Sequence, residues 1–235
     1  MIGTPRVSLV VAVYGVADCL PQFFASLDAQ TYPHERIEIV LVLDGVVDDS
    51  PTLCAQWSAG ADMSVRIVEQ DNAGQAAARN RGFASATGEW IGFPDPDDTL
   101  GPSYVEELMG ARDLRSPLLV ARMRIRRGAV DSPHPLDFRF EAGARTIDAA
   151  AQPQGIHLAT KCCLIHRSAL EALGPELFPE DRDAPIFDGA TLIGRLRAAD
   201  TRTVVASDAV YYFEKREAGD SAVQTAWTKP DGYVD

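Results

Sequence analysis

Short apolar runs rich in β-branched residues alternate with amphipathic segments through the first hundred residues of this chain. Residues 7–13 form one such run, continuous and apolar as expected for a strand buried on both faces. Strands that alternate with helices lie side by side in a parallel sheet, and the helices pack on both of its faces. The pattern predicts strands at 7–13, 37–43, 65–68 and 90–93, and helices at 18–30, 50–59 and 74–87.

The second half of the chain is less regular. Residues 126–154 are rich in proline, glycine and charge, which is typical of an excursion or of short β pieces. Because no internal repeat or interdomain linker is evident, we expect one mostly parallel, Rossmann-like α/β domain over residues 1–235. Further helices are predicted at 102–112, 164–173 and 189–199, and further strands at 118–125 and 203–210.

The charge balance narrows the class of partner. A net charge of −12 argues against nucleic acid and against an anionic membrane surface. A chain this acidic needs a divalent cation or a local basic pocket if it is to bind an anionic nucleotide. We find no basic and apolar leader and no run of about 18 apolar residues, so we expect no transmembrane segment and a cytoplasmic location, either as a whole chain or as part of a larger one.

The four cysteines show no spacing typical of a metal site. Cys162 and Cys163 are adjacent, so on a strand they would point to opposite faces and are not expected to pair with each other. Free thiols buried in a reducing cytosol are the expected state of all four, which are Cys19, Cys54, Cys162 and Cys163.

A cluster of carboxylates follows the predicted strand at 90–93. Asp95, Asp97 and Asp98 lie directly beyond it, and ligands bind at the carboxyl ends of strands in parallel sheets. Carboxylate oxygens are hard ligands that suit Mg²⁺ or Mn²⁺, and such ions neutralise phosphate charge. A solvated turn of aspartate and proline is the alternative interpretation of the same residues.

Four segments at predicted strand ends carry a resemblance when they are taken together. They are Val-Ala-Val-Tyr at 11–14, Leu-Asp-Gly-Val-Val-Asp-Asp-Ser at 43–50, Asp-Asn-Ala-Gly-Gln-Ala-Ala-Ala-Arg-Asn-Arg-Gly at 71–82 and Asp-Pro-Asp-Asp at 95–98. Their order resembles the inverting family-2 glycosyltransferases of GT-A fold, well over residues 6–100 and weakly beyond. The resemblance implies a nucleotide-sugar-binding half over about 1–100 and an acceptor-binding half over about 101–235.

The activity implied by this resemblance is a metal-dependent inverting transfer. The group moved would be hexosyl or N-acetylhexosaminyl, the donor a nucleotide-diphosphate sugar with UDP as the expected nucleotide, and the acceptor a hydroxyl of a glycan, polyol or other molecule. The matching positions imply that Ala12 and Tyr14 lie beneath the base and that Asp44 contacts it. Arg79 would reach a phosphate, Asp95 the ribose or nucleotide side, and Asp97 a Mn²⁺ or Mg²⁺ ion, while Asp98 would lie near the sugar or support the loop.

Each of these positions also has a plainer interpretation. Asp44 precedes Gly45 and can be a turn-forming aspartate, Tyr14 can be a core tyrosine, and Arg79 can be a solvated helix residue. Asn80 is expected to brace a loop rather than to touch substrate.

An inverting transferase needs a base that deprotonates the acceptor hydroxyl. The resemblance assigns this role to Asp188, at the start of the helix predicted at 189–199, where an N-cap is the plainer alternative. Glu180, Asp181 and Asp183 are competing bases nearby. Contacts to the diphosphate or the acceptor are implied for Lys161 and Arg216, with Lys215 as the alternative to Arg216.

Three departures from the family pattern leave other functions open. Leu43, Pro94 and Phe187 stand where the family often has Asp, Leu and Glu. A catalytically weak GT-A module that binds nucleotide or glycan within a larger assembly is therefore the alternative function. A nucleotidyltransferase is disfavoured, because residues 14–18 are a poor match to the glycine-rich, basic phosphate loop of that class.

Overall fold

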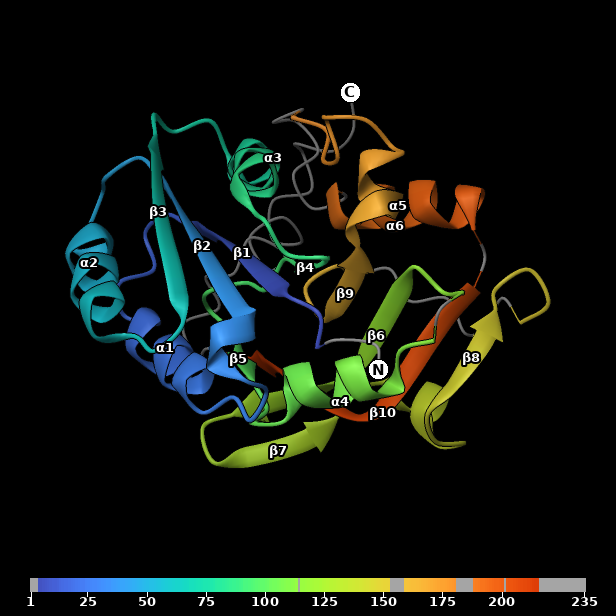
Figure 1. The fold of residues 1–235 in the computed structure, drawn as a ribbon. Helices are drawn as coiled ribbons and strands as arrows, with labels where there is room; N and C mark the ends of the chain where they lie inside the picture. The colour runs from blue at the N-terminus through green and yellow to red at the C-terminus, as the bar shows by residue number, and fades with distance from the viewer. Residues whose placement is uncertain (1–3, 114, 153–158, 181–187, 201, 216–235) are drawn as a thin grey trace, which may run out of the picture.

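The computed structural model describes residues 4–113, 115–152, 159–180, 188–200 and 202–215 (Figure 1). Its strands are β1 Val7–Val13, β2 Ile37–Asp44, β3 Ser64–Gln70, β4 Trp90–Gly92, β5 Thr99–Leu100, β6 Leu118–Arg127, β7 Val130–Pro133, β8 Arg145–Asp148, β9 Cys163–His166 and β10 Arg202–Glu214. Its helices are α1 Leu20–Asp28, α2 Ser50–Gly60, α3 Gln75–Ser85, α4 Tyr104–Ala111, α5 Arg167–Glu171 and α6 Asp188–Ala199, with short 3₁₀ segments η1 His34–Arg36 and η2 Asp137–Phe140.

One sheet runs through these residues in the order β3-β2-β1-β4-β9-β6-β10-β5, with β7 beside β6 and β8 beside β10. Strands β1 to β4 are all parallel, and every residue of β2 is buried. A central parallel strand covered on both faces has this continuous apolar character. Figure 1 shows α1 and α2 on one side of these strands and α3 on the other.

Helix α3 packs unusually close to the sheet. A Cβ atom at Gly82 would lie 2.3 Å from Val10 and 3.0 Å from Val42, so only glycine fits at this contact. The close approach brings the polar side chains of α3 near the carboxyl ends of the strands.

The second half extends the sheet with mixed strand directions. Strand β9 pairs antiparallel with both β4 and β6, so it joins the two halves. Strand β10 runs parallel to β6 and antiparallel to β5, which immediately follows the turn at 93–98. That turn therefore connects β4 to β5, and β5 pairs with the long strand β10.

The expected parallel half is confirmed, with element bounds that shift by a few residues. The short β pieces expected within 126–154 are also confirmed, as β7 and β8. The helix predicted at 164–173 is wrong, because the apolar run at its start is β9 and only Arg167–Glu171 is helical. A short apolar run buried between two strands has no periodicity that distinguishes it from a helix.

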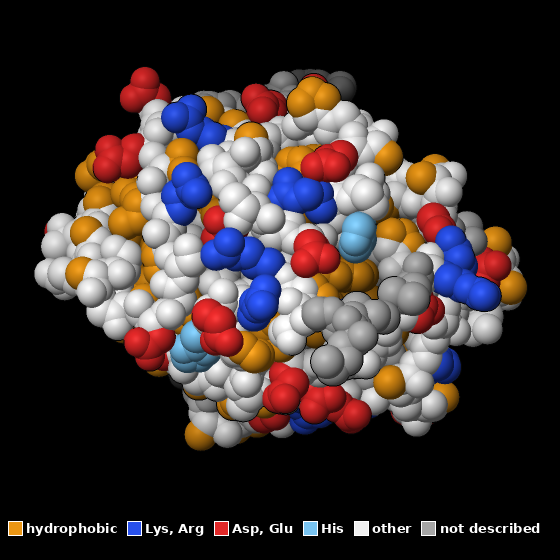
Figure 2. Space-filling model, in the orientation of Figure 1, with side chains coloured by type: hydrophobic (Ala, Val, Ile, Leu, Met, Phe, Trp, Pro, Cys, Tyr) orange, Lys and Arg blue, Asp and Glu red, His pale blue; other side chains and the backbone are white. Residues whose placement is uncertain are grey.

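The four cysteines are free, as expected, and three are buried, whereas Cys19 is only half-buried. No helix in the described part of the chain combines the length and the apolar character needed to cross a membrane. Despite the net charge of −12, basic and acidic side chains are interspersed on the face drawn in Figure 2.

A buried carboxylate ties β1, β2 and the segment before β4 together. Glu38 is 2% exposed and accepts hydrogen bonds from the Ser8 hydroxyl and from the Thr87 backbone N–H (2.7 Å) and hydroxyl (3.0 Å). Burial alone would raise the pKa of Glu38, but these hydrogen bonds outweigh it and hold the pKa below its ordinary value of 4.5.

We expect Glu38→Gln to lower the free energy of unfolding at pH 7 by about 1–3 kcal/mol, because Ser8 or Thr87 loses a charged acceptor. A carboxylate whose folded pKa is depressed stabilises the protein fully at pH values above its ordinary pKa of 4.5. That stabilisation is lost as the pH falls through the folded pKa. Urea denaturation should therefore show a gap between wild type and variant that narrows below pH 4.5. The exposed Glu35→Gln is the control, and a gap that does not change with pH would contradict the assignment.

Candidate functional site

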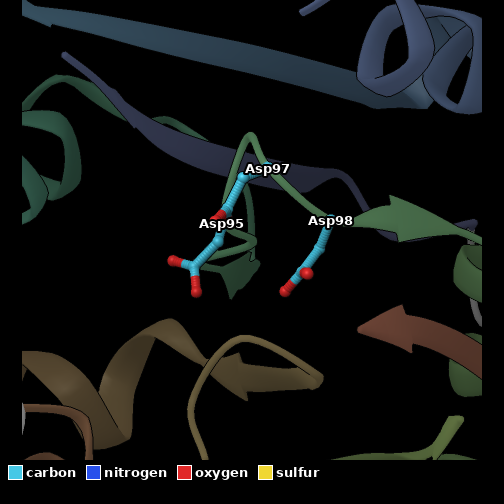
Figure 3. Close-up of side chains that lie close together, drawn as sticks. All are labelled: Asp95, Asp97 and Asp98. Atoms are coloured by element: carbon cyan, nitrogen blue, oxygen red, sulfur yellow. The ribbon is translucent and has the colours of Figure 1, made fainter. Parts of the chain in front are cut away.

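Three carboxylates gather on the turn between β4 and β5. One oxygen from each of Asp95, Asp97 and Asp98 lies within 4.8 Å of the others, so the cluster expected from the sequence forms. Figure 3 shows Asp95 and Asp98 projecting from the same side of the turn. Asp98 is 1% exposed, whereas Asp95 and Asp97 are half-buried. An ion that arrives from solvent would meet Asp95 and Asp97 first.

Asp98 anchors the turn to the rest of the sheet. Its Oδ2 accepts hydrogen bonds from Lys161 Nζ (2.7 Å) and from the Tyr211 hydroxyl (2.8 Å). Its Oδ1 accepts one from the backbone N–H of Glu214 (2.9 Å). Both oxygens are thus engaged by β10 and by the segment before β9, an arrangement that favours support of the loop among the roles considered for Asp98.

Asp95 lies between two basic side chains. Its Oδ1 is 2.7 Å from Arg79 Nη2, and its Oδ2 is 3.3 Å from Lys161 Nζ. Arg79 is only 4% exposed, so the solvated-helix interpretation of this residue is wrong. Its guanidinium also lies 5.3 Å from the ring centroid of Phe178.

Lys161 lowers the pKa of both Asp95 and Asp98, but burial outweighs this effect only at Asp98. Burial would raise the pKa of Asp95, but Lys161 and Arg79 outweigh it and lower that pKa. Burial raises the pKa of Asp98 to about 7, although Lys161 opposes the rise. The pKa of Lys161 is itself raised, because Asp98 and Asp95 outweigh its burial. Lys161 therefore keeps its proton between Asp98 and Asp95.

The donor set fits a hard divalent ion. Mg²⁺ and Mn²⁺ prefer carboxylate oxygens and complete their coordination with water and substrate phosphates. Asp97 and Asp95 are less buried than Asp98, so they are the side chains that such an ion would reach, although both oxygens of Asp95 already face Arg79 and Lys161.

Asp44 lies at the end of β2 and is 2% exposed. Its carboxylate accepts hydrogen bonds from the backbone N–H groups of Ala73 (2.7 Å) and Gly74 (2.9 Å), and from the Gln70 side chain (2.8 Å). Gly74 has φ +95°, a conformation that favours glycine, and it directly precedes α3. Asp44 therefore holds the loop that leads into α3. This structural role is larger than that of a residue that only forms a turn with Gly45.

The loop after β1 contributes an aromatic side chain at the same edge of the sheet. Tyr14 is 49% exposed, so it is not a core tyrosine, and Ala12 is half-buried within β1. An exposed tyrosine ring at the carboxyl end of a parallel strand can stack on a flat ligand.

Asn80, next to Arg79, braces a loop from the second half, as expected. Its side-chain amide donates to the Phe178 carbonyl (2.8 Å) and to Glu180 Oε1 (3.0 Å). It also accepts from the backbone N–H groups of Leu177 and Phe178. Glu180, one of the competing bases, is thereby held beside α3.

Other acceptor-side residues are only partly described. Asp188 begins α6, but its side chain lies outside the described residues. Asp181, Asp183, Phe187 and Arg216 also lie outside them.

Sequence reasoning missed the role of Tyr211. Its hydroxyl accepts from the backbone N–H of Asp95 (3.2 Å) and donates to Asp98 Oδ2. The run of aromatics at 211–213 was the available signal, but nothing in it indicates which acidic residue such a hydroxyl would contact.

Comparison with known proteins places these features in a family. Minor teichoic acid biosynthesis protein GgaB of Bacillus subtilis (strain 168) is 27% identical over 229 residues, which are 93% of this chain and 24% of GgaB. S. aureus TarS 1-349, solved in complex with UDP-GlcNAc, is similar with a TM-score of 0.76 and 21% identity over 90% of this chain and 59% of that one. The mannosyltransferase PcManGT from Pyrobaculum calidifontis, solved with GDP-Man and Mn²⁺, gives a TM-score of 0.69 and 22% identity over 96% and 60%.

These structural likenesses confirm the expected GT-A fold, an α/β domain with a mostly parallel sheet flanked by helices. The chain spans about a quarter of GgaB and about 60% of the solved chains. The family model for glycosyl transferase family 2 matches residues 8–174. The chain therefore belongs to glycosyl transferase family 2.

Proposed function

We propose that this chain is a metal-dependent inverting glycosyltransferase that moves a hexosyl or N-acetylhexosaminyl group from a UDP-sugar to a hydroxyl acceptor. The observation that carries the proposal is the carboxylate turn, held between Arg79 and Lys161 at the carboxyl end of the parallel strands. Support comes from the solved relatives, one in complex with UDP-GlcNAc and one with GDP-Man and Mn²⁺.

The donor nucleotide would bind along the ends of β1 and β2. Tyr14 offers an exposed ring for the base, with Ala12 beneath it, while Asp44 fixes the loop at the start of α3 that closes the same side. Asp95 faces the ribose or nucleotide side. Arg79 provides a permanently charged planar donor for a phosphate, although it would then share its hydrogen bonds with Asp95.

Asp97, with Asp95 beside it, would hold the divalent ion, Mn²⁺ or Mg²⁺. When bound, the ion supplies Lewis-acid stabilisation of the charge on the departing diphosphate. Lys161 holds Asp98 and Asp95 in place, and Arg216 or Lys215 would approach the diphosphate from the end of β10.

The transfer itself would be a single displacement. Asp188 takes the proton from the acceptor hydroxyl, whose oxygen bonds to the anomeric carbon on the face opposite the leaving group. The bond from that carbon to the diphosphate oxygen breaks, UDP departs with the electron pair, and the anomeric configuration inverts. A glycan or a polyol would serve as acceptor, and the cytoplasm, where nucleotide sugars are available, would be the place of reaction.

We expect Asp97→Asn to abolish the stabilisation that UDP gives in the presence of Mn²⁺. A ligand at about 100 times its Kd stabilises the folded state by about 2.7 kcal/mol, which thermal unfolding with UDP, Mn²⁺ or both resolves readily. The exposed Asp62→Asn serves as the charge-matched control. Wild-type UDP stabilisation and wild-type turnover in Asp97→Asn would show that the ion is held elsewhere.

We expect Asp188→Asn to bind UDP normally but to lower transfer by about 10²–10⁴-fold, because the amide cannot take the acceptor's proton. The loss of one carboxylate at the start of α6 should cost only about 0.3–1 kcal/mol of stability. Glu180→Gln, Asp181→Asn and Asp183→Asn are matched comparisons in a UDP-release assay with acceptor. If Asp188→Asn transfers normally and Glu180→Gln does not, the base is the carboxylate that Asn80 holds.

A further inference from the structure

We infer that Lys161 occupies carboxylate oxygens of the metal site and repels a divalent ion. The ion therefore binds strongly only together with the nucleotide diphosphate. This inference rests on the proposed function and assigns Lys161 a positioning role toward the ion. It concerns the order in which the site is loaded, not the identity of the sugar.

Lys161 lies between the two carboxylates on either side of Asp97. Its ammonium is 2.7 Å from Asp98 Oδ2 and 3.3 Å from Asp95 Oδ2. The same nitrogen lies 4.3 Å from the ring centroid of Phe213, so an aromatic face on β10 also holds it. With 19% of its side chain exposed, Lys161 is a fixed part of the site, unlike a solvated lysine.

The carboxylate oxygens around Lys161 already have partners. Asp98 accepts hydrogen bonds on both oxygens, and the two oxygens of Asp95 face Arg79 and Lys161. An ion of the Mg²⁺ type requires about six oxygen ligands near octahedral geometry and is reluctant to give up its water. The turn alone therefore offers such an ion few ligands that are not already engaged.

The charge of Lys161 acts in the same direction. An ammonium a few ångströms from a divalent ion repels it, and even across a water-like dielectric this changes binding by about tenfold or more. A nucleotide diphosphate reverses the balance, since its oxygens add both ligands and negative charge. The ion and the nucleotide would thus enter as a pair and leave as a pair, while Lys161 stabilises the carboxylates of the empty turn.

The experiment measures Mn²⁺ binding by the full chain from the electron paramagnetic resonance signal of free Mn²⁺, with and without UDP. Wild type should bind Mn²⁺ at least about tenfold more tightly with UDP than without it. Lys161→Met should gain about tenfold in nucleotide-free Mn²⁺ affinity, because Asp95 Oδ2 is released and a positive charge is removed. Lys161→Arg, which keeps the charge, should behave like wild type. Arg66→Gln, which removes one exposed positive charge from β3, should not change Mn²⁺ binding either.

Two results would overturn the inference. One is tight Mn²⁺ binding by wild type without UDP, a measurement that needs no variant and is unaffected if Lys161→Met folds poorly. The other is unchanged nucleotide-free affinity in a folded Lys161→Met that still binds Mn²⁺ with UDP, which would leave the proposed function standing. Failure of wild type to bind Mn²⁺ even with UDP would instead overturn both the inference and the proposed metal-dependent function.

Discussion

The arrangement of the site depends on the hydrogen bonds that the buried carboxylate of Asp98 accepts. A buried charge is tolerated only when it is paired and hydrogen-bonded, and Asp98 meets that condition with three donors. These donors come from Lys161, Tyr211 and the backbone of Glu214, all in the second half of the chain. The turn that carries the other two carboxylates thus takes its position from residues that lie more than sixty positions further along the chain.

Helix α3 makes the second connection between the halves. Arg79 reaches the carboxylate turn, and Asn80, the next residue, binds the loop at 177–180. Phe178 lies under Arg79 and packs edge-on against Phe93, with ring centroids 4.9 Å apart. Glycine and alanine let α3 approach the sheet closely, and its two adjacent polar side chains then bind the carboxylate turn and the loop at 177–180.

The parallel half and the positions of Asp44, Arg79 and Asp95 could be predicted because strand patterns and strand ends are local features of the sequence. The strand β9 could not, since its four residues owe their conformation to pairing with β4 and β6. The resemblance singled out Lys161, but its ion pairs with Asp95 and Asp98 were also beyond prediction. Its partners are fixed by long-range packing, and neither residue type nor spacing indicates which carboxylate a lysine will contact.

The position of β9 has a consequence for how the molecule is made. Strand β4 has β1 on one side and β9 on the other, so the sheet around the carboxylate turn stays open until residue 163 has been synthesised. Contacts between segments so distant along the chain form late, and unpaired strand edges invite aggregation meanwhile. A fragment that ended near residue 100 would contain strands β1 to β4, yet the Asp98 carboxylate would lack Lys161, Tyr211 and the Glu214 backbone, which fix it. We therefore expect the parallel half to need the second half in order to fold.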